Sequence, residues 1–201
     1  MFNKTVVISL ALLLAAPLVQ AAGNAKSGEQ KSGVCMGCHG PNGNSLNPVW
    51  PKLAGQSESY LAKQLADFKS GARKDPLMSG QAAALSTQDM ADLAAYYSKQ
   101  TISAGMADKA KLTLGQNVFR GGNKEKGIAA CIGCHGPSGA GNPSAKFPAV
   151  GSQQAEYTIK ALKDFRSGAR SNDPSKMMRD IAARMSDKEI EAVASYIAGL
   201  H

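Results

Sequence analysis

The chain has 201 residues, of which 43% are hydrophobic, 19% are charged and only 5% are aromatic, and its formal net charge is +8. These apolar residues exclude a disordered chain, because they are numerous enough to form a core. The basic residues are scattered singly with few aromatics between them, which argues against a nucleic-acid-binding protein. Residues 22–105 hold eight basic and six acidic residues, and residues 106–201 hold fourteen and nine, so the excess positive charge lies mainly in the second part.

The first 21 residues have the pattern of a secretory signal peptide. Lys4 precedes an apolar stretch over residues 6–16, and Val19 and Ala21 place small residues where a signal peptidase cleaves. The apolar stretch has about 11 residues, whereas a helix that spans a bilayer needs about 20. We therefore expect cleavage after Ala21 and export of the remaining chain.

The elements expected next are helices separated by loops. A short helix leads into the sequence Cys35-Met-Gly-Cys-His39, and its Gly28 is a small residue that permits close contact with another helix. A loop rich in Gly and Pro follows over residues 40–55. Residues 58–70 carry apolar side chains at helical spacing. After a loop that contains Met78, a capping box at Ser86 opens a last helix. The expected buried face of that helix consists of Met90, Leu93, Ala94 and Tyr97.

The same series of elements occurs again after residues 101–108. The Cys-x-x-Cys-His motif returns 96 residues later, and small insertions bring the other segments into register. The matched segments are 35–41 with 131–137, 67–73 with 164–170, and 86–96 with 186–196. The second capping box, at Ser186, precedes Ile190, Val193, Ala194 and Ile197, and Gly115 corresponds to Gly28. No strand pattern competes, so we predict an all-α protein with two tandem domains, residues 22–103 and 104–201.

The repeated motif Cys-x-x-Cys-His is the signature of c-type haem attachment. Cys35 and Cys38, and likewise Cys131 and Cys134, are spaced to form thioethers with the two vinyl groups of a porphyrin. The adjacent histidine, His39 or His135, is then placed to bind the iron. A prosthetic group in each domain also accounts for the low aromatic content, because domains of this size bury little core of their own.

Three alternatives use the same cysteines. A zinc site formed by all four thiolates requires the two pairs to converge on one metal, which is awkward for equivalent positions in separate repeats. Thiol–disulfide exchange suits an exported protein but leaves the two histidines unexplained, and the same holds for plain structural disulfides. Haem attachment is the favoured interpretation.

The second axial ligand of each iron is assigned by elimination. His201 is the only other histidine, so two bis-histidine haems cannot be built from this chain, and methionine is the next candidate. Among the methionines after the signal peptide, only Met78 and Met178 align with each other, each eight residues before a capping serine. We therefore predict ligation of one iron by His39 and Met78 and of the other by His135 and Met178.

Several aligned residues have predicted supporting roles. The carbonyls of Pro51 and Pro148 are candidates to accept the N–H of the ligating histidines, with an ordinary turn proline as the alternative. Arg73 and Arg170 are candidates to pair with haem propionates, with a solvated charge at a helix end as the alternative. Two aromatic pairs complete this group, one expected at the ring edge and one in the core or an interface: Trp50 with Phe147, and Tyr96 with Tyr196.

The chain resembles the cytochrome c4 family, whose members consist of two class I cytochrome c domains. The resemblance covers nearly all of the chain after the signal peptide and rests on three pairs of segments: CMGCHG with CIGCHG, WPKLAGQ with FPAVGSQ, and LADFKSGAR with LKDFRSGAR. It implies two covalently bound haem c groups, His–Met ligation at the four residues above, and a periplasmic location. It also implies a non-enzymatic carrier of electrons from quinol–cytochrome c reductase to a haem–copper terminal oxidase, with possible peripheral binding to the membrane.

Two further function classes remain as alternatives. A di-haem peroxidase requires an iron with an open axial position, which two matched methionines argue against, and a thiol–disulfide oxidoreductase requires cysteines without haem. For the carrier, we expect the basic second domain to meet an acidic partner surface, with Lys160, Lys163 and Arg166 contributing.

Overall fold

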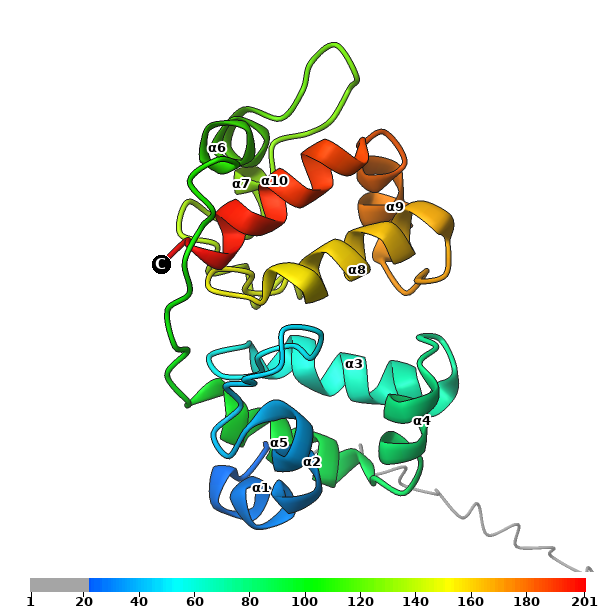
Figure 1. The fold of residues 1–201 in the computed structure, drawn as a ribbon. Coiled ribbons are helices and arrows are strands. Elements are labelled where there is room, and N and C mark those ends of the chain that lie inside the picture. The colour runs from blue at the N-terminus through cyan, green and yellow to red at the C-terminus, as the bar shows by residue number, and fades with distance from the viewer. Residues whose placement is uncertain (1–21) are drawn as a thin grey trace, which may run out of the picture.

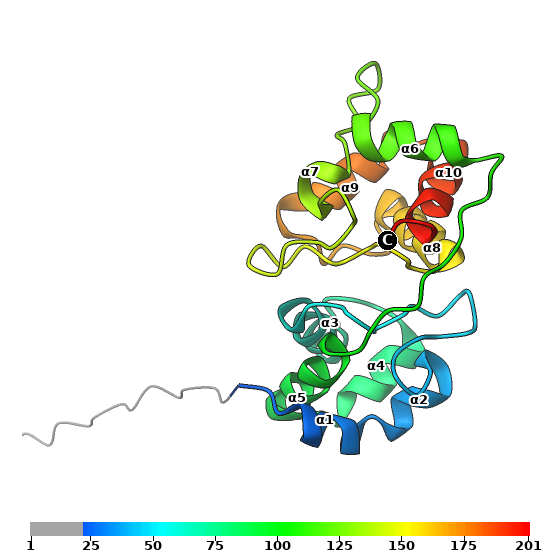
Figure 2. The same ribbon diagram turned by 90° about the vertical axis from the view of Figure 1, so that its left-hand side faces the viewer.

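The computed structural model describes residues 22–201, so the predicted signal peptide lies outside the described residues. The chain folds into two helical halves, one stacked on the other, which an extended linker joins along one side (Figure 1 and Figure 2). Within residues 22–201, β-structure is limited to two isolated bridges, Asn123 with Ile128 and Asn142 with Phe147, so the all-α prediction is confirmed. None of the helices in this range is long and apolar enough to cross a membrane.

Five helices form the N-terminal half: α1 (Ala25–Lys31), α2 (Gly33–His39), α3 (Glu58–Ser70), α4 (Pro76–Ala83) and α5 (Thr87–Ser98). The last helix, α5, packs against both α1 and α3, and α4 packs against α3. The cysteine-bearing helix α2 follows α1 after a single residue, Ser32.

The C-terminal half repeats this arrangement with α6 (Leu112–Gly121), α7 (Ile132–His135), α8 (Ala155–Ser167), a 3₁₀ turn at Pro174–Lys176, α9 (Met177–Ala182) and α10 (Asp187–Ala198). Here α10 packs against α6 and α8, as α5 packs against α1 and α3. Residues 122–130 form an additional loop between α6 and α7, which has no counterpart between α1 and α2.

The predicted helix signals are confirmed in both halves. Ser86 and Ser186 each form a capping box with the acidic residue three positions later. Helix α3 has the predicted bounds of residues 58–70 and ends at Gly71, which adopts the left-handed conformation with φ of 79°. The predicted buried faces of α5 and α10 are all at most 5% exposed.

The first and last helices of each half cross at a glycine, as the sequence predicted. A Cβ atom on Gly28 would lie 2.0 Å from the backbone oxygen of Asp92, and one on Gly115 would lie 2.2 Å from that of Ala192. These distances leave no room for a side chain. Helix α1 can therefore approach α5, and α6 can approach α10, only through glycine.

The segments that carry Met78 and Met178 are helical, whereas the sequence led us to expect loops. Asp75 caps α4 by accepting a hydrogen bond from the backbone N–H of Met78, and Pro76 occupies the first helical position. Met178 is the second residue of α9. The helices have only eight and six residues, too few for apolar periodicity to reveal them.

Candidate haem sites

Each Cys-x-x-Cys-His motif ends a short helix. Helix α2 ends at His39 and α7 at His135, and the glycine that follows each has a positive φ, 80° at Gly40 and 77° at Gly136. Cys35 and Cys38 lie within α2, whereas Cys131 is the N-cap residue of α7 and Cys134 lies within that helix. All four cysteines have free thiols, so neither pair forms a disulfide in the structure.

The imidazoles of the two motif histidines are oriented by proline carbonyls. Nδ1 of His39 lies 2.8 Å from the carbonyl oxygen of Pro51, and Nδ1 of His135 lies 2.9 Å from that of Pro148. A carbonyl oxygen only accepts, so Nδ1 donates in both rings and Nε2 keeps its lone pair. Burial lowers the pKa of both histidines, although the hydrogen bond to the carbonyl opposes this. The predicted role of the two prolines is confirmed, and each ring presents a neutral Nε2 suited to a metal.

The first thiol of each pair is poorly suited to disulfide exchange. Burial raises the pKa of Cys35, and it raises the pKa of Cys131 to about 11. Exchange requires a thiolate, which enzymes obtain by lowering the thiol pKa. In residues 22–201 no group of three or more His, Cys, Asp or Glu side chains is placed to hold a metal ion, so the two cysteine pairs do not form a shared zinc site.

The two methionines are half-buried within their own halves. Met178 packs against the apolar core of the C-terminal half, which Cys131 and Ile132 also contact. Met78 is fixed from its backbone by the Asp75 cap. The assignment of these methionines as ligands stays a prediction.

The donor groups fit a haem in each half. Two free thiols, one imidazole with an available Nε2 and one thioether are the groups that attach and ligate a c-type haem. The N-terminal half adds a sign of a missing neighbour, because the hydroxyl of Tyr97 is buried without a hydrogen-bond partner in a cluster that Cys35 also contacts. Unsatisfied buried hydroxyls are rare in complete sites.

Comparisons with known proteins place the chain in a family. A family model described as Cytochrome c matches the chain twice, over residues 25–100 and 113–201. Cytochrome c4 of Pseudomonas aeruginosa is 50% identical over 200 residues, 99% of this chain and 100% of that protein. The crystal structure of reduced recombinant cytochrome c4 from Pseudomonas stutzeri matches with a TM-score of 0.88 at 50% identity, covering 90% of this chain and 100% of that one. The chain belongs to the cytochrome c4 family.

Membership in the cytochrome c4 family gives the chain two covalently bound haem c groups, one for each cytochrome c domain. It is a di-haem electron-transfer protein. A more distant relative from Thiomonas intermedia, 42% identical over 94% of this chain and 86% of that protein, is named a thiosulfate dehydrogenase electron acceptor. The predictions of the family, the fold and the cofactors are confirmed.

Two aligned arginines cross the boundary between the halves. Arg73 donates to the hydroxyl of Tyr157 at 3.1 Å, and Arg170 donates to the hydroxyl of Tyr60 at 2.8 Å. Burial alone would raise the pKa of Tyr157, but the two nearby guanidinium groups lower it. Arg170 is only 9% exposed, so the interpretation as a solvated helix-end charge is wrong for this residue. Neither guanidinium pairs with a carboxylate of residues 22–201, and pairing with haem propionates stays a prediction.

A second reciprocal contact involves glutamines that the sequence analysis missed. The side chain of Gln56 bonds both backbone groups of Ala149 at 2.8 and 2.9 Å. The side chain of Gln153 bonds both backbone groups of Lys52 at the same two distances. The signal was present, because these glutamines end the aligned segments WPKLAGQ and FPAVGSQ. Both halves thus contribute matching contacts to one interface.

The remaining aromatic predictions have mixed outcomes. Tyr196 is 7% exposed in the core of the C-terminal half, and Tyr96 is half-buried with its hydroxyl donating to the carbonyl of Pro41 at 3.0 Å. Both therefore pack within their own halves, as expected for core residues. Trp50 and Phe147 are half-buried, and their contact with the edge of a haem stays a prediction.

Proposed function

We propose that Cys35 and Cys38 attach one haem, with His39 and Met78 as its axial ligands, and that Cys131, Cys134, His135 and Met178 do the same for the other. The observation that carries this proposal is the engagement of Nδ1 of each histidine by a proline carbonyl, which leaves Nε2 as the free nitrogen. We also propose domains at residues 22–103 and 104–201, preceded by a cleaved signal peptide over residues 1–21. The absence of helix between Ser98 and Leu112 supports this boundary.

Bound haem supplies a one-electron couple between ferrous and ferric iron. The protein's part is to hold the ligands in place during that change. Pro51 and Pro148 fix the orientation of the two imidazoles, and the cap of α4 fixes the backbone of Met78. Ligation by the thioethers of Met78 and Met178 would raise the reduction potential, and an iron held by both a histidine and a methionine would have no site for a substrate. The protein is therefore suited to carry electrons rather than to catalyse a reaction.

The partners proposed for this carrier are quinol–cytochrome c reductase as donor and a haem–copper terminal oxidase as acceptor, in the periplasm, with peripheral binding to the membrane. A second donor is suggested by the relative named a thiosulfate dehydrogenase electron acceptor. These donors differ in whether quinol or thiosulfate supplies the electrons. Reduction of the purified protein by each isolated enzyme, followed in the visible spectrum, separates the two cases.

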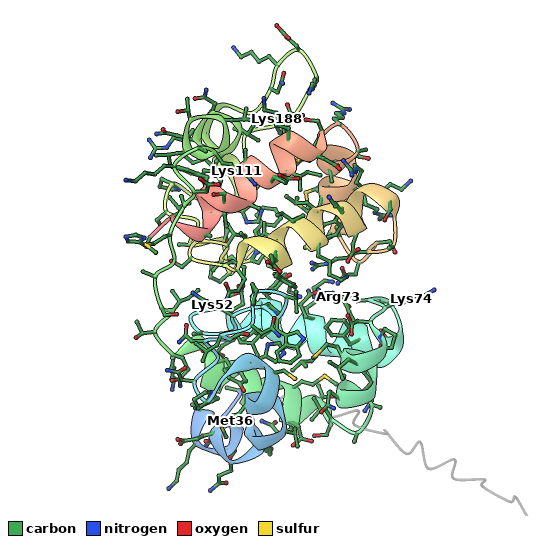
Figure 3. The ribbon with its side chains drawn as sticks, in the orientation of Figure 1. Met36, Lys52, Arg73, Lys74, Lys111 and Lys188 are labelled. Atoms are coloured by element: carbon green, nitrogen blue, oxygen red, sulfur yellow. The ribbon has the colours of Figure 1, made fainter. Side chains whose placement is uncertain are left out.

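The cations that we expected to meet an acidic partner surface already have carboxylate partners within the protein. Lys160 pairs with Asp164, and Lys163 and Arg166 both lie within ion-pair distance of Asp187, so these three cations are partly neutralised. Exposed lysines that pair with no carboxylate of residues 22–201, such as Lys124 and Lys188, present more charge to a partner. Figure 3 shows Lys188 on the side of the C-terminal half that faces away from the N-terminal half.

The ligand assignment is tested by spectroscopy of the exported protein. A pyridine haemochrome assay should give two haems per chain, and ferric protein should absorb near 695 nm, where Met–iron bonds absorb. Met78→Ala and Met178→Ala should each remove about half of that band and lower one reduction potential. The control Met90→Leu changes a buried core methionine and should leave the band intact. An unchanged band in either ligand variant would contradict that assignment.

A further inference from the structure

Lys52 is a buried cation in the N-terminal half. It is 7% exposed, and its Nζ donates to the backbone carbonyl of Ser103 in the linker at 2.6 Å. Among residues 22–201 no carboxylate lies within ion-pair distance of it. Burial lowers its pKa from the ordinary value. Figure 3 shows Lys52 at the edge of the N-terminal half that faces the C-terminal half.

The C-terminal half has the same backbone at the matching position but no charge there. Gln153 binds the backbone N–H and C=O of Lys52, and Gln56 binds those of Ala149 in the same way. Lys52 and Ala149 each directly follow the proline that orients the histidine of their own half. The two sites therefore differ at this position by one side chain, an ammonium group in one and a methyl group in the other.

The position of Lys52 links its charge to His39. The carbonyl that accepts the Nδ1–H of His39 belongs to Pro51, and the next residue along the chain is Lys52. A nearby positive charge makes that carbonyl a weaker acceptor and the imidazole a weaker donor to iron. It also disfavours the additional positive charge of ferric iron, and such effects are larger where water is excluded. Both effects favour the reduced state.

We propose that Lys52 raises the reduction potential of the haem attached to the N-terminal half and thereby sets how an electron is shared between the two haems. This proposal rests on the assignment of His39 as a ligand of that haem. The charge of Lys52 changes the equilibrium constant for sharing by about three- to tenfold. For a one-electron couple this corresponds to about 28–59 mV, at 59 mV for each factor of ten.

The test is a potentiometric titration of the full di-haem protein, with the two haems distinguished by the NMR signals of their axial methionines. Lys52→Met should lower the reduction potential of the N-terminal haem and so change the equilibrium constant for electron sharing by about three- to tenfold. The potential of the C-terminal haem should stay unchanged. Lys52→Arg keeps the charge and should restore the original sharing. Ala149→Lys introduces a cation at the matched position and should favour reduction of the C-terminal haem.

Each result supports or overturns the proposal. If Lys52→Met and Lys52→Arg shift the potential equally, the lysine acts through packing and the linker contact, and the proposal is wrong. If Lys52→Arg raises the potential above the original value, the native lysine is uncharged, and the proposal is again wrong. Failure of the His39 assignment is recognised separately, because His39→Ala would then leave the visible spectrum and the reduction potential of the N-terminal haem unchanged.

Discussion

The two halves share one arrangement of helices but build their interiors differently. In the C-terminal half ten buried apolar side chains form one continuous cluster, with the fully buried Phe119 and Ile190 among them. The corresponding cluster of the N-terminal half has four members, Leu61, Leu93, Ala94 and Tyr97. Because apolar burial is the main favourable contribution to folding, the N-terminal half depends more on its prosthetic group.

The difference begins in the first helix of each half. Helix α6 supplies Val118 and Phe119 to the core, whereas α1 has the polar sequence AKSGEQK and buries only Gly28. Polar contacts hold α1 instead, since Lys31 lies 2.6 Å from Asp92 and 2.7 Å from Asp89. The same crossing of helices is thus held by ion pairs in the N-terminal half and mainly by apolar packing in the C-terminal half, where Lys111 and Glu191 add one ion pair.

Loss of haem attachment should have the largest effect, and it should affect the two halves unequally. In Cys35→Ala/Cys38→Ala, the thin N-terminal core loses the group it packs against, and amide exchange protection in α5 should fall by about 100-fold or more. In Cys131→Ala/Cys134→Ala, the ten-residue cluster should keep most of the protection in α10. Hydrogen exchange read by mass spectrometry measures both variants, and a haem assay should find one haem in each. Equal losses in α5 and α10 would show that the core sizes do not matter.

The glycine crossings should give the next largest effect. Gly115→Ala places a Cβ 2.2 Å from the backbone oxygen of Ala192 and should cost about 3 kcal/mol, the upper range for overpacking. Gly28→Ala should cost less, about 1–2 kcal/mol, because the short polar helix α1 can shift away. The control Gly121→Ala lies at the end of α6 with nothing within 4 Å of the new Cβ and should be neutral or slightly stabilising. Urea unfolding measures all three.

Acid should weaken the crossing of the first and last helices more in the N-terminal half than in the C-terminal half. The ion pair with Lys31 lowers the pKa of Asp89 and lowers that of Asp92 to about 2. Burial alone would raise the pKa of Glu189, but hydrogen bonds from Ser186 and Lys126 lower it to about 2. A lowered carboxylate pKa contributes stability above the unfolded value, and that contribution is lost as the pH falls toward the folded value.

The N-terminal half has two such carboxylates at the crossing of its first and last helices, Asp89 and Asp92, whereas the C-terminal half has one near its crossing, Glu189. Arg166 of α8 also lowers the pKa of Asp187, but that carboxylate stabilises the contact of α8 with α10. Between pH 4.5 and 2.5 the stability of α1 against α5 should therefore fall more steeply than that of α6 against α10. Asp92→Asn should flatten the pH dependence of the N-terminal half only, and Glu189→Gln that of the C-terminal half only. NMR peak intensities during urea unfolding at several pH values measure each half. Parallel slopes in the unaltered protein would contradict this expectation.

Surface charge should give the smallest difference. Lys124→Glu/Lys188→Glu in the C-terminal half should slow electron transfer to an isolated terminal oxidase several-fold at low salt, by weakening electrostatic steering. Lys160→Gln, which removes a cation already paired with Asp164, should change the rate less than twofold. Lys74→Glu/Lys99→Glu provides the matched change on the N-terminal half. Stopped-flow rates at several ionic strengths compare the three variants.

The sequence predicted the features that depend on local signals. Capping boxes at Ser86 and Ser186 and the helix over residues 58–70 follow from residues close together in the chain. The small size of Gly28 and Gly115 predicted close helix contact, although the partner residues lie far along the chain. The helix that contains Met78 was missed because eight residues show little periodicity, although Asp75 and Pro76 are typical of a helix start. Short helices are better recognised by their caps than by their apolar pattern.

Features that depend on how the two halves meet could not be predicted from the sequence. The contact of Arg170 with Tyr60 joins residues 110 positions apart, and it exists only because α3 and α8 face each other across the interface (Figure 1). The burial of Lys52 is similar, since the linker and Gln153 together cover it. Lysine is normally a surface residue, and the residues next to Lys52 in the sequence give no sign that it is buried.

The reciprocal glutamine contacts have a consequence for the origin of the molecule. An interface in which the same residues meet from both sides is the kind that two identical subunits form about a twofold axis. Two identical subunits must carry every substitution twice, so they cannot place an ammonium group on one side and a methyl group on the other. Joining both copies in one chain removes that restriction, and Lys52 opposite Ala149 is a difference that a homodimer could not have acquired.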